Sequence, residues 1–170
     1  MLNQRLNNKE LFHSFLKEIP KNKSSSDKER LLLLPLNQKL LNEYLEDLWE
    51  YSSIKDFYKY LEYPAFSSFD ECKNYFYNIL SGIKNETEML WLIIHKKDKK
   101  AIGTIRLHYW DLYRKKTQIG YGISPNYGKK GYFSEALLTI INYTFEKLKF
   151  YRIEAWTRWD NIGSIKGLEK

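Results

Sequence analysis

The 170-residue sequence is poor in cysteine and in long apolar runs, and each scarcity excludes a class of protein. Its one cysteine, Cys72, excludes an internal disulfide and any metal site built from several cysteines. No run of about 18 uncharged apolar residues predicts a membrane-spanning helix. Polar residues interrupt the apolar ones near the N-terminus, so no secretory signal is predicted. We therefore expect a cytoplasmic protein with neither a membrane segment nor a metal site.

Hydrophobic residues make up 43% of the chain, a proportion typical of a folded globular protein. A length of 170 residues predicts one domain with a short extension, since domains commonly hold about 100–200 residues. Helical spacing of apolar residues over 2–19, then Pro20 and a polar serine-rich run over 21–27, predict a helical appendage and linker at 1–29. The domain itself is expected to span 30–170.

Charge is distributed unevenly along the chain. The net charge is +7, and residues 95–130 alone carry +8, whereas residues 31–94 carry −5. Adjacent basic and acidic stretches fit a protein with two ligands, one a polyanion and the other a cation. Two alternatives stay open on charge alone: both stretches are solvated surfaces, or the basic one binds nucleic acid.

The spacing of apolar residues predicts a mixed α/β domain without internal repeats. Strands are expected at 30–36, 89–95, 101–110, 117–123 and 152–156. Helices are expected at 37–51, 54–63, 68–82, 132–149 and 160–170. Asn37 and Ser68 are suitable N-caps for the first and third helices, and Gly82 is expected to end the third.

The segment 124–131, SPNYGKKG, joins a predicted strand to a predicted helix. Gly128 and Gly131 allow backbone N–H groups to converge on a phosphate at the helix N-terminus, and Lys129 and Lys130 add positive charge. The spacing matches neither a Walker loop nor a dinucleotide-binding fingerprint. Taken alone, the segment is also compatible with an ordinary turn.

Four runs together resemble the GNAT acyl-CoA N-acyltransferases, and within them the RimJ/RimL-like branch. The runs are QIGYGISPNY from Gln118, GYFSEAL from Gly131, YRIEA from Tyr151 and NIGSIKGLEK from Asn161. RLLLLPL from Arg30 and AIGTIRL from Ala101 are similar to the first strand and the central hairpin of that branch. The resemblance covers about residues 30–170. It implies a mixed, mostly antiparallel sheet flanked by helices, acetyl-CoA as co-substrate and an amine-bearing acceptor.

The resemblance also implies which residues bind acetyl-CoA. In the family's phosphate loop Gly131 matches, Gly128 replaces a Gln or Arg, and Phe133 replaces a small residue. The strand beside the pantetheine arm implies backbone contacts, and an Asn-x-x-Ser motif places Asn161 on the pantetheine and Ser164 near the thioester. The full implied set is Tyr121, Gly122, Ile123, Ser124, Gly128, Lys129, Lys130, Gly131, Tyr132, Phe133, Asn161 and Ser164.

The implied chemistry is direct attack of a neutral amine on the thioester, with a base that takes the amine's proton. Glu154 matches a recurrent glutamate of the family and is the first candidate for the base; a purely structural glutamate is the alternative. Gln118 stands where related enzymes carry a second glutamate, and it is expected to orient a water. Leu168 stands where the family has a tyrosine general acid, which leaves that role to Ser164 or solvent.

Other residues have two interpretations. His95 and His108 lie in strand patterns, where a structural role is the expectation. Five aromatic residues near the second helix either shape an acceptor pocket or belong to the core: Phe57, Tyr58, Tyr60, Tyr63 and Phe66. The acidic stretch is expected to border the acceptor entrance and to favour an amine, with Glu62, Asp70 and Glu71 as the charges to test.

Family members continue beyond the Leu-Glu-Lys at 168–170 with two further strands, so the resemblance implies an incomplete sheet edge. Two explanations stay open: the chain is cut short there, or a partner chain covers the edge, as in a homodimer. The expected function is acetyl-CoA-dependent N-acetylation of a protein N-terminus or a small-molecule amine. The alternative is a truncated GNAT-like domain that binds CoA or a protein partner without catalysis. Nucleic acid is the least expected partner, because the basic stretch coincides with the implied CoA phosphate side.

Overall fold

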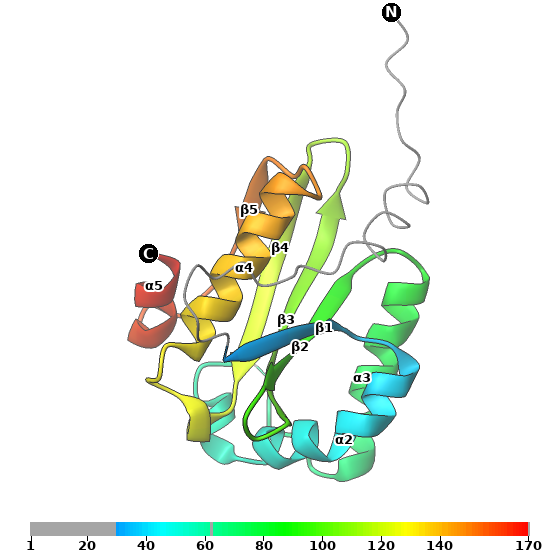
Figure 1. Ribbon diagram of the computed structural model, residues 1–170, viewed down its shortest axis with the longest axis vertical. Helices are drawn as coiled ribbons and strands as arrows, with labels where there is room; N and C mark the ends of the chain where they lie inside the picture. The colour runs from blue at the N-terminus through cyan, green and yellow to red at the C-terminus, as the bar shows by residue number, and fades with distance from the viewer. Residues whose placement is uncertain (1–29, 62, 170) are drawn as a thin grey trace, which may run out of the picture.

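A five-stranded sheet forms the centre of the computed structural model, which describes residues 30–61 and 63–169 (Figure 1). The strands lie in chain order: β1 (Leu31–Pro35), β2 (Met89–His95), β3 (Lys100–Asp111), β4 (Lys116–Ile123) and β5 (Arg152–Glu154). Neighbours among the first four pair antiparallel, and β5 pairs parallel with β4. The predicted mixed, mostly antiparallel sheet is confirmed. The helix predicted at 2–19 lies outside the described residues.

Helices cover both faces of the sheet (Figure 1). The elements are α2 (Gln38–Ser52), α3 (Phe69–Lys84), α4 (Tyr132–Glu146), α5 (Ile162–Leu168) and the short 3-10 turns η1 (Lys55–Tyr58) and η2 (Pro125–Tyr127). Helices α2 and α3 share one apolar cluster with the sheet, and α4 shares the other. None of the helices in the described part of the chain has the length and apolar character that crossing a membrane requires.

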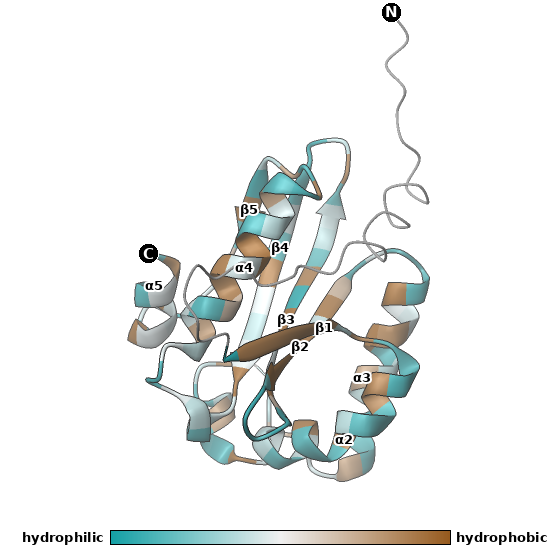
Figure 2. Cartoon of the chain, in the orientation of Figure 1, coloured by the Kyte–Doolittle hydropathy of each residue, from teal (hydrophilic) through white to brown (hydrophobic). Residues whose placement is uncertain are grey.

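Strand β2 explains why the sheet needs helices on both sides. All seven of its residues, MLWLIIH, are buried, and the first six are apolar; Figure 2 shows brown along much of the visible strand. Trp91 and Ile93 enter the cluster that contains α4, whereas Leu90 and Leu92 enter the cluster that contains α2 and α3. A strand that is apolar on both faces is stable only between two covering layers.

The predicted helix starts at Asn37 and Ser68 are confirmed. The Asn37 side chain accepts a hydrogen bond from the Leu40 N–H at 3.0 Å, and Ser68 Oγ accepts one from the Glu71 N–H at 3.2 Å. The Glu71 carboxylate in turn accepts from the N–H and hydroxyl of Ser67. These bonds satisfy donors that the first helical turn otherwise leaves unpaired.

Two predicted helices differ from the structure. The helix expected at 54–63 is only the 3-10 turn η1. The Phe57 ring lies 5.1 Å from the Tyr58 ring and 5.0 Å from the Tyr51 ring, and this packing takes the place of a helical stripe. Gly82 does not end α3, which continues to Lys84. A Cβ at Gly82 would overlap the carboxylate of Glu88, so this glycine serves packing.

The ends of the last elements also differ from the sequence prediction. Helix α4 ends at Glu146, three residues early, because Leu148 and Phe150 turn into the core and Lys149 takes a positive φ of 57°. Strand β5 ends at Glu154 and not at 156. Helix α5 begins after Asn161, two residues later than the predicted start at 160.

Candidate active site

Strands β4 and β5 separate halfway along β4. Their pairing runs from Lys116 opposite Arg152 to Gln118 opposite Glu154, and beyond it β4 has no partner on this side among the described residues. The outer edge of β5 likewise has no strand partner in the described part of the chain. A homodimer through that edge stays a prediction.

The backbone of β4 alternates in direction along the open edge. The Ser124 N–H donates to the Ile102 carbonyl at 2.7 Å, so the even-numbered residues of β4 face β3 in the regular antiparallel ladder. The N–H and C=O groups of Tyr121 and Ile123 therefore point to the side that β5 has left. Of the four predicted backbone contacts, these two residues have free groups there, whereas Gly122 and Ser124 pair with β3.

The open edge leads to the N-terminus of α4. Gly131 takes the N-cap position with φ 80°, a left-handed conformation that favours glycine, and no side chain caps the first turn. Lys129, two residues before Gly131, also has a positive φ, 60°, and its side chain is exposed. Lys130 Nζ bonds the Asn126 carbonyl at 3.3 Å. The first-turn N–H groups and two lysines thus form a positively polarised end.

Arg30 braces this loop from the start of β1. Its guanidinium donates to Glu135 Oε2 at 2.8 and 3.0 Å and to the Lys130 carbonyl at 2.9 Å, and it stacks over the Tyr132 ring at 4.4 Å. The Tyr132 hydroxyl lies 3.0 Å from Nε2 of the buried His95. Arg30 and His95 therefore fix the backbone of the loop, and the described contacts of His95 are structural ones.

The basic stretch at 95–130 divides between the two ends of the sheet (Figure 1). The β2–β3 turn, with lysines at 96, 97, 99 and 100, lies beside the loop after β4, because the Tyr127 hydroxyl donates to Asp98 at 2.6 Å. The basic residues at 114–116 lie at the opposite end, in the β3–β4 turn. Positive charge thus gathers at the α4 N-terminus without forming one continuous basic face.

Helix α5 brings Ser164 to the α4 side of β4. Ser164 is buried, and its Oγ lies 2.6 Å from the Tyr121 hydroxyl. Asn161 Oδ1 accepts from the Ser164 N–H at 3.2 Å, so this oxygen serves as the N-cap of α5. Burial raises the pKa of Tyr121, and the bond to Ser164 opposes that shift in part. The hydroxyl pair is therefore protonated at neutral pH and lies next to the open edge.

Phe133 is accommodated by a glycine of α5, Gly167. Its ring lies 4.5 Å from that of Tyr121, and a Cβ at Gly167 would come within 2.6 Å of it. The large side chain fits because Gly167 has none. Leu168, at the position implied for a tyrosine acid, packs against the core cluster on this face.

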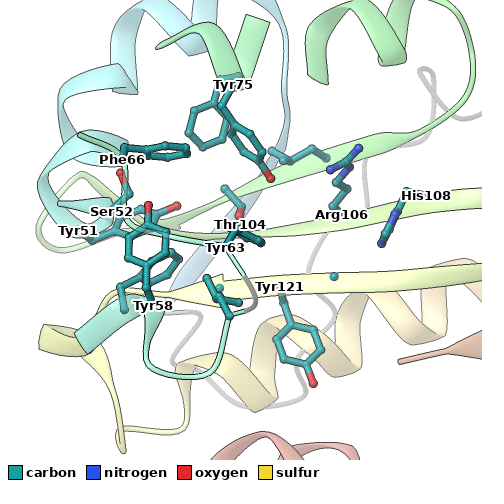
Figure 3. Close-up of a pocket in the computed structure, with 16 residues that line it drawn as sticks. Tyr51, Ser52, Tyr58, Tyr63, Phe66, Tyr75, Thr104, Arg106, His108 and Tyr121 are labelled. Atoms are coloured by element: carbon teal, nitrogen blue, oxygen red, sulfur yellow. The ribbon is translucent and has the colours of Figure 1, made fainter. Parts of the chain in front are cut away.

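A cavity of about 290 Å³ lies on the opposite face of β3 and β4, beneath α2, η1 and α3 (Figure 3). Aromatic rings form much of its wall: Tyr51, Phe57, Tyr58, Tyr63, Phe66, Tyr75 and Phe76. Thr104, Arg106 and His108 of β3 project into it, together with the bare backbone of Gly120 and Gly122 in β4. Figure 3 shows Tyr121 directed away from this cavity.

The predicted aromatic set is therefore divided. Phe57, Tyr58, Tyr63 and Phe66 line the cavity, and Tyr60 does not. Asp70 and Glu71 are exposed in the first turn of α3 and are not among the residues that line the cavity, and their place at its entrance stays a prediction. Glu62 lies outside the described residues.

Glu154 and Gln118 stand in one row with His108 across β5, β4 and β3, on the cavity face of the sheet. Neither Glu154 nor Gln118 is among the residues that line the cavity. Glu154 Oε1 lies 2.9 Å from Arg152 Nε and 3.8 Å from Lys116 Nζ. The candidate base is thus ion-paired one step beyond the cavity wall, and its catalytic role stays a prediction.

His108 has the environment of a neutral imidazole. Burial, and then the positive charge of Arg106, lower the pKa of His108 to about 4. Its Nε2 lies above Gly120, at 3.4 Å from where a Cβ would be. At neutral pH the ring therefore presents uncharged nitrogens in the cavity wall, one of which accepts hydrogen bonds.

This environment makes a prediction for the dependence of stability on pH. The unfolded chain protonates His108 near pH 6.5 and the folded chain near pH 4, so the unfolded state binds more protons between these values. Stability therefore rises with pH across that window, by about 0.5–1 kcal/mol per pH unit from this group after solvent screening. Urea unfolding from pH 4.5 to 7.5 should show a smaller slope for His108→Asn. Identical slopes would contradict the assignment.

The sequence did not single out Arg106, Tyr51 or Tyr75 for the cavity, and it assigned His108 a structural role. One signal was present: residues 104, 106 and 108 alternate with apolar residues on β3 and so share a face. A strand face that carries an arginine and a histidine, with Gly120 opposite Arg106 and Gly122 opposite Thr104 on the next strand, is poorly suited to a core.

The open edge of β4, the uncapped N-terminus of α4 and the aromatic cavity all border or approach β4. The open edge and the helix end suit an extended ligand that carries phosphate, and the cavity suits a small one. An arrangement of this kind could serve the transfer of a group between two ligands.

Comparison with known proteins identifies the class. Residues 30–170 match the acetyltransferase (GNAT) domain model. An uncharacterized N-acetyltransferase p20 of Bacillus licheniformis is 31% identical over 142 residues, which cover 81% of this chain and 75% of that protein. The crystal structure of a GNAT-family acetyltransferase from Bacillus anthracis matches with a TM-score of 0.69 and 29% identity, over 83% and 78% of the two chains.

A spermidine N-acetyltransferase from Vibrio cholerae, solved with CoA and spermine, shares the fold with a TM-score of 0.69 at 19% identity, over 84% and 79% of the two chains. The chain belongs to the GNAT acetyltransferase family. Membership makes it an acyltransferase with acetyl-CoA as co-substrate, as the sequence predicted.

Proposed function

We propose that this chain transfers the acetyl group of acetyl-CoA to a primary amine held in the aromatic cavity, and that it belongs to the RimJ/RimL-like branch. One observation carries the proposal: β4 borders both ligand spaces. Its open edge presents the backbone of Tyr121 and Ile123, and its cavity face presents the bare backbone of Gly120 and Gly122. A donor along the edge and an acceptor in the cavity would meet across one strand.

The described residues fit the co-substrate. The two outward-facing peptide groups of β4 suit the amides of a pantetheine arm, and the N-terminus of α4 suits its diphosphate. Lys129 and Lys130 supply positive charge there, and Gly131 permits the turn. When bound, acetyl-CoA supplies an activated acyl thioester.

The acceptor amine must lose a proton for the transfer. His108, uncharged at neutral pH, accepts a hydrogen bond from the amine at the cavity wall, and Gln118 and Glu154 continue that row toward solvent. On the other face, the hydroxyl pair of Tyr121 and Ser164 would give a proton to the departing CoA thiolate beside the open edge. The group that accepts the amine's proton and the group that protonates the thiolate thus lie on opposite faces of β4.

The test is calorimetric titration of the chain with acetyl-CoA, followed by assay of released thiol with primary amines. We expect micromolar binding in the wild type and about 10-fold weaker binding in Lys129→Asn/Lys130→Asn, because two cations near the phosphates are lost. The matched control is Lys39→Asn/Lys84→Asn, which removes the same charge from exposed positions on α2 and α3.

Three outcomes separate the candidate functions. Binding with thiol release supports the enzyme. Binding without release for any amine favours a CoA-binding domain that lacks turnover. No binding at millimolar acetyl-CoA overturns the proposal, and a steep salt dependence of affinity for RNA or DNA would then favour the basic stretch as a nucleic-acid site.

A further inference from the structure

Arg106 stands where two hollows meet. It lines the aromatic cavity together with His108, and the same two residues line a second, more open hollow of about 550 Å³ at the start of β2. Figure 3 shows both side chains on the cavity face of the sheet. An acceptor that enters through the open hollow would therefore pass the guanidinium before it reaches the aromatic rings.

The guanidinium is held at one point and free at the others. Its Nε is in contact with Glu88 Oε2, a carboxylate that is buried against Gly82. No described residue accepts a hydrogen bond from its two terminal nitrogens. Glu88 thus orients the guanidinium plane, and the fork formed by Nη1 and Nη2 remains available to a planar anion such as a carboxylate.

Charge in the aromatic cavity favours the same ligand. Arg106 is the one charged side chain among the described residues that line this cavity, whereas its partner Glu88 and the neighbouring Glu86 line the open hollow. A carboxylate in the aromatic cavity therefore meets the free side of the guanidinium, and an amine that also carries a carboxylate brings no net charge into this partly buried space. The rings of Tyr51, Phe66 and Tyr75 suit an apolar or aromatic side chain.

The strand register sets the spacing of these groups. Arg106 pairs directly with Gly120, and His108 pairs with Gln118 one step along, with the His108 ring above Gly120. The contact with Glu88 holds the guanidinium toward the β2 side of β3, so a carboxylate bound there would leave the adjoining amine to be directed toward His108 and β4. In an α-amino acid a single carbon carries both the carboxylate and the amine.

We propose that the acceptor is a free α-amino acid with a large apolar or aromatic side chain, and that Arg106 binds its carboxylate. The inference rests on the proposed acetyltransferase function and chooses a small molecule over a protein N-terminus. A peptide N-terminus lacks the adjacent carboxylate. A polyamine lacks both the carboxylate and the apolar side chain.

The test compares acceptors that differ by one group, with acetyl-CoA saturating and released thiol as the readout. L-Phenylalanine is compared with phenethylamine, which lacks the carboxylate, and with phenylalanine amide, which masks its charge. Spermidine and a peptide with N-terminal phenylalanine complete the panel. We expect kcat/KM for phenylalanine to exceed that for phenethylamine by roughly 30-fold, the value of a bidentate charge-assisted contact.

Variants of Arg106 locate the effect. Arg106→Lys keeps the charge and loses the fork, and it should raise KM for phenylalanine at least 10-fold more than KM for phenethylamine. Glu88→Gln/Arg106→Gln removes the ion pair together and tests the same loss without an unpaired charge. The matched control is Arg114→Lys, an exposed arginine of the β3–β4 turn, which should change neither KM.

The outcomes distinguish this inference from the function on which it rests. Spermidine, phenethylamine or the peptide turned over as well as phenylalanine overturns the amino-acid acceptor and leaves the acetyltransferase intact. An equal effect of Arg106→Lys on both amines also overturns it. Failure to bind acetyl-CoA overturns both proposals, whereas selective loss of phenylalanine turnover in Arg106→Lys supports both.

Discussion

Replacement of Gly131 by valine is expected to lower the free energy of unfolding by about 2 kcal/mol and to weaken acetyl-CoA binding at least roughly 10-fold. The φ of 80° places a β-branched residue in a region that it strongly disfavours. To escape, the loop must move, and it would carry away the Lys130 carbonyl that Arg30 binds at 2.9 Å. Chemical denaturation and calorimetric titration measure the two effects.

Lys129→Asn is the control that separates backbone from charge at this loop. Asparagine tolerates the positive φ of 60° at this position, so the free energy of unfolding should stay within about 0.5 kcal/mol of the wild type. Acetyl-CoA affinity should fall only a few-fold, because one exposed cation is lost. A Gly131→Val chain with wild-type affinity would show that the α4 N-terminus does not hold the co-substrate.

The elements that the sequence predicted well are those fixed by local chemistry. Asn37 and Ser68 cap their helices through side-chain bonds that span three residues, and β2 is apolar from Met89 to Ile94. The 3-10 turn at Lys55–Tyr58 and the two residues of α3 past Gly82 were missed because distant partners decide them. Glu88 and the packed rings near Tyr51 supply those partners, and no local pattern shows them.

The two sides of the site differ in the same way. On the donor side, Gly131 and its lysines are consecutive in sequence, so a motif could indicate them. On the acceptor side the wall joins α2, η1, α3, β3 and β4, whose contact depends on the whole fold. His108 illustrates the limit: the larger cause of its lowered pKa is burial, which exists only after α2, η1 and α3 have covered this face of the sheet.

Glu88→Gln is expected to lower the free energy of unfolding by about 2–3 kcal/mol, the second large effect. The Glu88 side chain is 9% exposed and that of Arg106 29%, so removal of the carboxylate leaves a partly buried positive charge without its partner. A partner lost from a fully buried pair commonly costs about 3–5 kcal/mol, and the partial exposure of Arg106 reduces that value. Urea unfolding of the full chain at neutral pH measures it.

Glu88→Gln/Arg106→Gln completes a double-mutant cycle with both single variants. We expect the double variant to lie within about 1 kcal/mol of the wild type, with a coupling energy of at least about 2 kcal/mol, because both charges leave together. Additive losses would mean that each side chain stabilises the fold through other contacts. A strong coupling means that Glu88 holds the guanidinium in place before any acceptor arrives, so little ordering remains when the acceptor binds. Phenylalanine turnover should then fall in Glu88→Gln even though the guanidinium is still present, because its fork is no longer oriented.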